Sequence, residues 1–278
     1  MFWFDGTLHE SSIAPFDLTD RGLTLGDGLF DTSLARNGQI FRRKAHLDRL
    51  AASAETLAIP FDPAAATRAL DALAGAIGEG TVRLTLTRGG GTRGLALPAH
   101  PKPCLFGAAS PATSGATFPV LALATSSIRR NETSPVTRLK ALPYLDAILG
   151  LREALACGAD DVLFENMAGH VACLSVANIF AVLGQSLVTP PLTDGVLAGT
   201  IRAFILDKAI SLGFVAEERS LTRAELSCAD AVFATNSIRL LAPCRAIDGM
   251  AFASAEHEGV KRLQAMLRDA IVIECGRA

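Results

Sequence analysis

The chain reads Thr137-Arg138-Leu139-Lys140-Ala141-Leu142-Pro143-Tyr144 and, further on, Val171-Ala172-Cys173-Leu174-Ser175-Val176-Ala177-Asn178-Ile179-Phe180, so that Cys173 follows Lys140 by 33 residues. Lys140 stands between an apolar run and the start of a predicted helix. A lysine amine can form a Schiff base with an aldehyde, and it does so best where desolvation lowers its pKa. Lysines are rarely buried, however, so Lys140 taken alone is expected to be a solvated surface residue. The rest of the chain decides between these interpretations.

The composition indicates a globular protein with a small-molecule partner. A chain of 278 residues, 50% of them hydrophobic, can form one large or two modest domains around a substantial core. Its 26 basic and 28 acidic residues give a formal net charge of -2. That charge offers no electrostatic case for binding nucleic acid or an anionic membrane surface.

The amino terminus and the cysteines bear on location and redox state. The start, Met1-Phe2-Trp3-Phe4-Asp5-Gly6, reaches an acidic residue and a glycine too early for a signal-peptide core, and no uncharged apolar stretch is long enough to span a membrane. We therefore expect a cytoplasmic protein. The six cysteines are scattered, without a CxxC pair or nearby histidines at zinc-ligand spacing, so reduced thiols and no metal site are expected.

In the first half of the chain, the hydrophobic pattern changes from helical to strand periodicity. Apolar residues at helical spacing predict an amphipathic helix over residues 46–58, and strict alternation predicts a half-buried strand over residues 81–87. Residues 107–119 are rich in small residues and proline and lack periodicity, so they are a candidate linker. We therefore expect an N-terminal α/β domain over residues 1–115 and a C-terminal α/β domain over residues 116–278.

The second half also mixes helices and strands. Pro143 in a first turn and Gly158 just past the end predict a helix over residues 143–157, and a second helix over residues 200–212 closes at Gly213. Thr222-Arg223-Ala224-Glu225 has the pattern of a capping box. Short apolar runs bounded by turn signals predict strands over residues 161–164, 178–182, 186–189 and 231–234. The predicted fold class is α/β, in the sense of a mixed α+β chain.

Four further motifs, taken in order with the two opening stretches, resemble one enzyme family. The segment Asp20-Arg21-Gly22-Leu23-Thr24-Leu25-Gly26-Asp27-Gly28-Leu29-Phe30-Asp31-Thr32 is similar to its DRG…GDG(V/L/C)(F/Y) signature, and His46-Leu47-Asp48-Arg49-Leu50 to its HxxRL motif. Gly199-Thr200-Ile201-Arg202 and Thr235-Asn236-Ser237 complete the order. The chain thus resembles the fold-type IV, or class IV, pyridoxal-phosphate enzymes, which include D-amino-acid and branched-chain aminotransferases and aminodeoxychorismate lyases.

This resemblance implies a fold, a cofactor and an assembly. The fold is a smaller N-terminal α/β sandwich domain and a larger C-terminal α/β barrel-like domain that carries the Schiff-base lysine, with the cofactor between them. The cofactor is pyridoxal 5'-phosphate, and the assembly is a homodimer. The substrates are amino acids and keto acids, and no nucleic acid or membrane is expected as a partner.

The resemblance also implies roles for particular residues. Lys140 is the expected catalytic residue. Arg49 is the expected phosphate ligand, and its fork of donors suits phosphate oxygens. The backbone N–H groups of Thr200 and Ile201 at a helix start suit the same anion. The remaining expected contacts are Tyr144 with the cofactor's phenolic oxygen, Cys173 at the ring nitrogen, Ser237 at the phosphate, and Phe30 and Arg93 with the substrate.

Cys173 departs from the family pattern, which has a glutamate there. A carboxylate beside the pyridine nitrogen keeps the nitrogen protonated, so the ring can stabilise the carbanion left when the substrate loses its α-proton. A thiol cannot do so comparably, and apolar surroundings disfavour the thiolate. Asp161 or Glu165 could replace the glutamate, but the sequence does not place either against the ring.

The reaction is therefore open among three hypotheses. The first is an aminotransferase acting on D-amino acids or branched-chain amino acids, and family frequency favours it. The second is a 4-amino-4-deoxychorismate lyase that releases pyruvate. The spacing RGxGxRG over residues 88–94 and Thr235-Asn236-Ser237 favour it, as does Leu95 where D-amino-acid aminotransferases have a histidine. The third, favoured by Cys173, is a cofactor-binding relative with weak or lost turnover.

Overall fold

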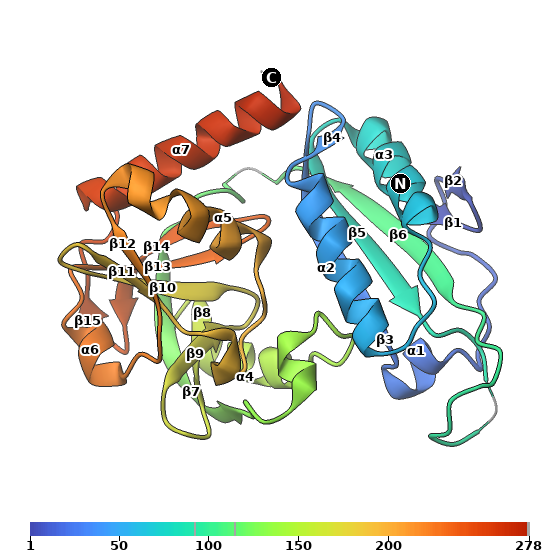
Figure 1. Cartoon of the computed structure of the whole chain (residues 1–278), viewed down its shortest axis with the longest axis horizontal. Helices are drawn as coiled ribbons and strands as arrows, with labels where there is room; N and C mark the ends of the chain where they lie inside the picture. Colours follow the sequence, from blue (N-terminus) through green and yellow to red (C-terminus); the bar gives the residue numbers. More distant parts are fainter. Residues whose placement is uncertain (92, 114, 277–278) are drawn as a thin grey trace. The chain divides into compact units, whose positions relative to one another are not determined.

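The computed structural model describes residues 1–91, 93–113 and 115–276, and these form two compact units (Figure 1). The first unit comprises Met1–Thr113, Leu139–Pro143 and Ala270–Ala278, and the second comprises Ser114–Arg138 and Tyr144–Asp269. The short segment that contains Lys140 thus belongs to the first unit. The division into domains at residue 115 remains a proposal about which parts fold independently. The mixed α/β class is confirmed.

The first unit is built on a six-stranded sheet in the order β2-β1-β6-β5-β3-β4. All of its strand pairs are antiparallel. The strands are β1 (Phe2–Phe4), β2 (Thr7–His9), β3 (Gly28–Arg36), β4 (Gln39–Ile40), β5 (Gly80–Thr87) and β6 (Cys104–Pro111), and the helices are α1 (Arg21–Leu25), α2 (Arg43–Thr56) and α3 (Pro63–Ile77). The strand predicted over residues 81–87 and the helix predicted over residues 46–58 correspond to β5 and α2.

Helices α2 and α3 pack on this sheet (Figure 1). Helix α3 begins where the Asp62 side chain accepts from the backbone of Ala64, with Pro63 in the first turn. Its apolar face contributes Leu70 and Leu73 to a buried cluster with strand residues. A Cβ at position 107 would lie 2.7 Å from the Leu73 side chain and 3.1 Å from the Arg83 carbonyl oxygen, so the close approach of α3 favours a glycine there.

The linker predicted over residues 107–119 is therefore wrong for residues 107–111, which form the second half of β6. The small residues there allow close packing beneath α3. They do not mark a flexible segment.

The segment that carries Lys140 is fixed against β3 by backbone hydrogen bonds. The N–H of Phe30 donates to the carbonyl of Lys140 at 2.9 Å, and the N–H of Leu142 donates to the carbonyl of Gly28 at 3.0 Å. Ala141 is buried in a cluster with Leu29. The backbone of Lys140 is thus held beside Phe30.

The second unit is built on a nine-stranded sheet in the order β12-β11-β10-β13-β14-β7-β8-β9, with β15 beside β14. An added pairing between β9 and β10 closes six of these strands into a ring, which gives the barrel-like form. The strands are β7 (Leu121–Arg130), β8 (Asp161–Asn166), β9 (Val171–Leu174), β10 (Asn178–Leu183), β11 (Ser186–Thr189), β12 (Val215–Glu218), β13 (Ala231–Asn236), β14 (Leu240–Ile247) and β15 (Met250–Ala251). All four strands predicted for this half are among them.

Four helices complete the second unit, namely α4 (Leu145–Ala156), α5 (Thr200–Ala209), α6 (Arg223–Ser227) and α7 (Glu258–Cys275), whose last turns group with the first unit. The predicted capping box is present at the start of α6. Tyr144 is the residue that precedes α4, and Lys140 lies outside that helix. The two residues therefore do not share a face of that helix.

Within the described part of the chain, no helix is both long and apolar enough to cross a membrane.

Candidate active site

Lys140 has the environment expected of a reactive amine. Burial lowers the pKa of Lys140 from 10.5 to about 8, and the positive charges of Arg49 and Arg83 act in the same direction against the opposing charge of Asp31. Its Nζ lies 4.5 Å from the centroid of the Phe30 ring. The first unit thus places an amine that is easily deprotonated beside an aromatic surface.

Asp31 organises the cations around this amine. It lies on β3, is 5% exposed, and accepts from Arg49 Nη2 at 2.6 Å and Arg49 Nε at 3.0 Å. His46 Nδ1 lies 2.5 Å from its other carboxylate oxygen. Burial alone would raise the pKa of Asp31, but the charges of Arg49 and His46 outweigh it and the net shift of that pKa is downward. Asp31 is therefore a buried carboxylate that fixes the orientation of Arg49.

Sequence analysis did not single out Asp31, His46 or Arg83 as functional. Two of them stood inside the quoted motifs: His46 opens HxxRL, and Asp31 follows Phe30 in the GDG segment. Arg83 is an exposed residue of β5 whose guanidinium carbon lies 3.7 Å from the centroid of the Phe30 ring. The position of His46 in the motif that contains Arg49 could have pointed to it, but the strand register that brings Arg83 to Phe30 has no sequence signal.

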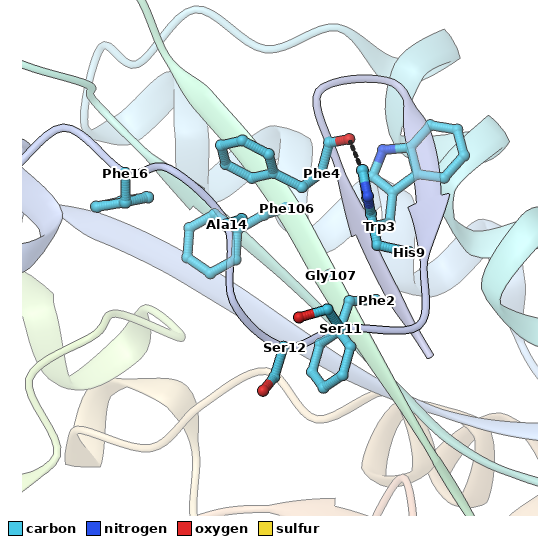
Figure 2. A pocket seen from close by; sticks show the side chains of 10 residues that line it. All are labelled: Phe2, Trp3, Phe4, His9, Ser11, Ser12, Ala14, Phe16, Phe106 and Gly107. Atoms are coloured by element: carbon cyan, nitrogen blue, oxygen red, sulfur yellow. Dashed lines mark hydrogen bonds between the residues drawn. The ribbon is translucent and has the colours of Figure 1, made fainter.

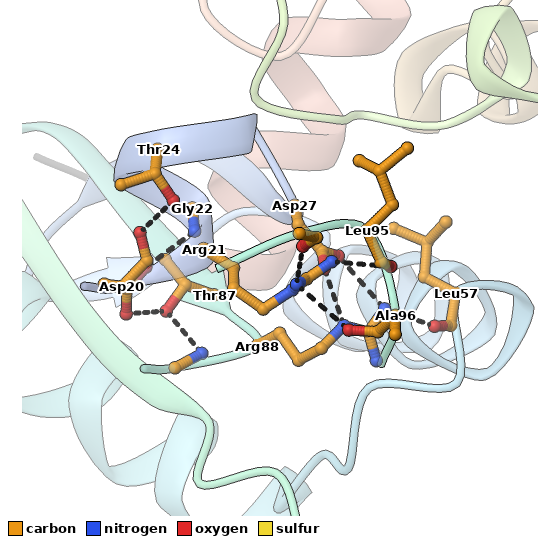
Figure 3. A network of polar contacts seen from close by, with 12 residues as sticks. Asp20, Arg21, Gly22, Thr24, Asp27, Leu57, Thr87, Arg88, Leu95 and Ala96 are labelled. Carbon is orange, nitrogen blue, oxygen red and sulfur yellow. Dashed lines mark hydrogen bonds and ion pairs between the residues drawn. The ribbon is translucent and has the colours of Figure 1, made fainter. Parts of the chain in front are cut away.

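The two arginines of the 88–94 loop have different environments. Arg88 is 3% exposed, and its side chain donates to Asp27 and to the carbonyls of Leu57 and Ala58 (Figure 3). Arg93, by contrast, is exposed. Arg88 therefore stabilises the fold, and Arg93 alone of the two presents its side chain to solvent. Thr92 lies outside the described residues.

Arg21 holds the segment that follows Arg93. Its guanidinium donates to the carbonyls of Gly94 and Leu95 at 3.0 and 3.3 Å, and to that of Ala96 at 3.3 Å (Figure 3). Arg21 is itself 4% exposed and is paired with Asp27 at 2.8 Å. The arginine of the DRG motif thus fixes the loop that carries the exposed Arg93.

The second unit contains a group of residues suited to a phosphate. Helix α5 starts after Gly199, no side chain of the described residues caps it, and its first N–H groups are those of Thr200 and Ile201. The Thr200 and Ser237 hydroxyl oxygens lie 3.2 Å apart. The Asn178 side chain donates to the Leu197 carbonyl at 2.9 Å, which fixes the approach to the helix. A helix start with two hydroxyl groups matches a phosphate monoester.

A buried hydroxyl beside this group supports the fit. Thr235 is 1% exposed, and its Oγ1 has no hydrogen-bond partner among the residues that the structure describes. It pairs with Asn178 across β10 and β13, and Asn178 pairs with Cys173 across β9 and β10. A buried hydroxyl rarely remains unpaired in a folded protein, so a polar ligand here would satisfy it. The residues present therefore fit the phosphate of the expected cofactor.

Cys173 lies in an apolar cluster of the same unit. It is 8% exposed and pairs with Phe164 across β8 and β9. Burial raises the pKa of the Cys173 thiol, against the opposing charge of Arg130. A neutral thiol is therefore favoured, as expected from its apolar surroundings.

The two acids considered as replacements for the missing glutamate, Asp161 and Glu165, already have partners within the protein. Asp161 is fully buried and accepts from Ser175 Oγ at 2.5 Å and from Arg239. Strand alternation along β8 also puts Asp161 on the face opposite Phe164, and so opposite Cys173. Glu165 is paired with Arg129.

Each unit brings some of the expected site residues together. The first unit groups Lys140, Phe30 and Arg49, and the second groups Thr200 and Ser237, with Ile201 next in the helix. Their cofactor and substrate roles, and those of Tyr144, Cys173 and Arg93, remain predictions.

A cavity of about 310 Å³ in the first unit is separate from these residues (Figure 2). Its lining includes Phe2, Phe4, Phe16 and Phe106, and none of the expected site residues. In the part of the chain that the structure describes, no cluster of three or more histidine, cysteine or acidic side chains could hold a metal ion.

The fold and these groups of residues can be compared with those of known proteins. A model of the family described as amino-transferase class IV matches residues 28–247, and the chain belongs to that family. Its members depend on pyridoxal phosphate. The resemblance seen in the sequence is therefore confirmed, as is the fold class of two α/β domains.

Similar proteins carry more than one activity. The branched-chain-amino-acid aminotransferase of Pseudomonas aeruginosa is 29% identical over 90% of this chain and 85% of its own length. The D-alanine aminotransferase of Bacillus licheniformis is 27% identical over 99% of this chain and 98% of its own length. The crystal structure of 4-amino-4-deoxychorismate lyase from Pseudomonas aeruginosa superimposes with a TM-score of 0.87 at 33% identity, covering 97% of this chain and 98% of that one. The family is thus established, and the reaction within it is not.

Proposed function

We propose that this chain is a pyridoxal-phosphate-dependent aminotransferase that moves an amino group between a small amino acid and a 2-keto acid. The observation that carries the proposal is the lowered pKa of Lys140, about 8, in a motif order that matches the family. At pH 7 such an amine is neutral in roughly one molecule in ten, whereas one with a pKa of 10.5 is neutral in roughly one in three thousand. Lys140 is thus suited both to attach the cofactor and to accept a proton.

The proposed cofactor contacts use the donors described above. Arg49, Thr200, Ile201 and Ser237 bind the phosphate, which matches their charge, free N–H groups and hydroxyls. Tyr144 donates to the phenolic oxygen. When bound, pyridoxal phosphate supplies a carbonyl that links to amines and a ring that accepts negative charge from the substrate's α-carbon.

Lys140 then acts as the general base and acid. Its neutral amine would take the α-proton from the substrate and deliver a proton to the cofactor's aldehyde carbon, which lies on the other side of the amino nitrogen. Burial chiefly, and then the charges of Arg49 and Arg83, keep the amine's pKa low, and Asp31 limits how far it falls. Arg93 binds the substrate carboxylate, and Phe30 forms an apolar wall that suits a small D-amino acid or a branched-chain amino acid. We further propose a homodimer, to be checked by analytical ultracentrifugation.

A lyase that releases pyruvate from 4-amino-4-deoxychorismate is the second candidate. Leu95 stands where the D-amino-acid enzymes have a histidine, and its side chain is 81% exposed. Thr235-Asn236-Ser237 and the similarity to the Pseudomonas aeruginosa lyase support the same alternative. The proton transfer by Lys140 would be shared by both reactions. A relative with weak turnover, because of Cys173, is the third candidate.

One experiment separates these candidates. The cofactor-loaded protein is incubated with D-alanine, branched-chain amino acids and 4-amino-4-deoxychorismate in separate reactions. Formation of pyridoxamine phosphate with an amino acid supports the aminotransferase, and pyruvate from the chorismate derivative supports the lyase. The Lys140→Ala variant is the control and should do neither. No turnover with any of these substrates would leave the third candidate in place of the first two.

A further inference from the structure

We propose that Arg130 is the charged neighbour of the cofactor's ring nitrogen in this chain, and that it keeps the nitrogen unprotonated where relatives use a glutamate to protonate it. The inference rests on the proposed cofactor and on the match of Cys173 to the glutamate position.

Three observations place Arg130 on the same face as Cys173. Arg130 ends β7 and pairs with Asn166 of β8. Its guanidinium carbon lies 5.8 Å from the centroid of the Phe164 ring, and Phe164 is the cross-strand partner of Cys173. Arg130 is also the cation whose charge acts on the Cys173 thiol. The Phe164 ring thus has the guanidinium near its face and the thiol beside it on the next strand.

Among the residues that the structure describes, Arg130 has no carboxylate partner. Its Nε is buried and unpaired, and none of the described residues forms an ion pair with its guanidinium. Arg130 as a whole is partly exposed, but a guanidinium with a buried, unpaired nitrogen is unusual, because desolvation costs free energy that an ion pair would offset. A glutamate at position 173 would supply the missing charge. The cysteine therefore removes an anion from the site and leaves the cation in place.

The other charged groups near Cys173 do not compensate. On β8, Asp161 is paired with Arg239 and Glu165 with Arg129. On β10, the residue opposite Cys173 is the neutral Asn178. Before α5, the apolar Val196 packs into the same cluster. Glu132, beyond the end of β7, accepts from the Met167 backbone.

Arg130 is therefore the cation on this face that no carboxylate neutralises by an ion pair among the described residues. A positive charge near a pyridine nitrogen disfavours its protonation, just as a carboxylate favours it. A neutral ring accepts less charge from the substrate's α-carbon, so reactions that depend on a long-lived carbanion would be slow in this chain.

Four proteins test the proposal: the wild type, Cys173→Glu, Arg130→Gln and the double variant. The first readout is ¹⁵N NMR of protein loaded with ring-labelled pyridoxal phosphate, titrated with acid. We expect an unprotonated nitrogen in the wild type at pH 7, and a protonation midpoint about one pH unit higher in Arg130→Gln. An unchanged midpoint in a variant that still holds the cofactor on Lys140 would overturn the role of Arg130.

The second readout does not need the cofactor. Urea unfolding of the four cofactor-free proteins gives the coupling between positions 130 and 173 as a double-mutant cycle. Cys173→Glu changes the unfolding equilibrium constant by some factor in each background. We expect that factor to favour folding about tenfold more with Arg130 present than in the Arg130→Gln background. If the two substitutions change the free energy of unfolding independently of each other, the two side chains are not close and the proposal is overturned. If Cys173→Glu does not fold, the titration of Arg130→Gln decides. A cofactor that fails to attach to Lys140 would instead contradict the proposed function.

Discussion

Replacing Lys140 with methionine is expected to stabilise the cofactor-free protein at neutral pH, and less so at alkaline pH. Folding lowers the pKa of Lys140 from 10.5 to about 8, chiefly through burial and then through the charge of Arg49. Between these two pKa values the unfolded chain binds a proton that the folded chain releases. The stability of the wild type therefore rises with pH across that window, and the cost of the buried amine is fully present below pH 8.

The lowered pKa of Lys140 corresponds to about 3 kcal/mol at pH 6.5 and to about 1 kcal/mol at pH 9.5. Methionine has a similar length and no charge, so Lys140→Met should gain stability at pH 6.5 and lose about 2 kcal/mol of that gain by pH 9.5. Urea unfolding of both proteins at the two pH values measures the difference. The matched control is Lys44→Met, because the Lys44 side chain is 89% exposed. The difference in free energy of unfolding between this variant and the wild type should be nearly the same at both pH values. If the stability difference between Lys140→Met and the wild type does not change with pH, the lowered pKa of Lys140 is refuted.

Three other substitutions probe the carboxylate, the loop and the helix start. Asp31→Asn should lower the free energy of unfolding by roughly 3 kcal/mol, since it leaves Arg49 buried without its counter-ion; a loss below about 1 kcal/mol in urea would contradict that role. Arg21→Lys should raise the KM for the amino donor about tenfold with little change in kcat, because lysine cannot hold several loop carbonyls at once, and steady-state kinetics with an unchanged KM would exclude it. Gly199→Ala should weaken pyridoxal phosphate binding about tenfold in an equilibrium titration, because the added methyl group would overlap the side-chain oxygen of Asn178; undiminished affinity would show that the start of α5 does not bind the phosphate.

Much of the fold follows from periodicity in short segments. Alternation predicted the strand that is β5, and the capping box at Thr222 is present at the start of α6. The same approach failed at residues 107–111, because a run of small residues is typical of turns when only the sequence is considered. There the requirement comes from α3, whose Leu73 needs the space left by Gly107. Packing between distant segments has no local pattern.

The candidate site could likewise be predicted only in part from the sequence. The order of motifs identified Lys140 and the family without any structure. It did not reveal Asp31 as the carboxylate that orients Arg49, nor the unpaired hydroxyl of Thr235, because both depend on how separate strands and helices pair. The absence of a carboxylate beside Arg130 is of the same kind, since the cysteine was visible in the sequence and its charged neighbour was not.

The most direct test of the cofactor is borohydride reduction of the protein after incubation with pyridoxal phosphate, followed by digestion and mass spectrometry. Reduction makes the link between the cofactor and its lysine permanent. We predict one pyridoxyl group, on the peptide that contains Lys140, and none in the Lys140→Met variant. A pyridoxyl group on a different lysine, or none in the wild type, would contradict the assignment of Lys140 as the residue that holds the cofactor.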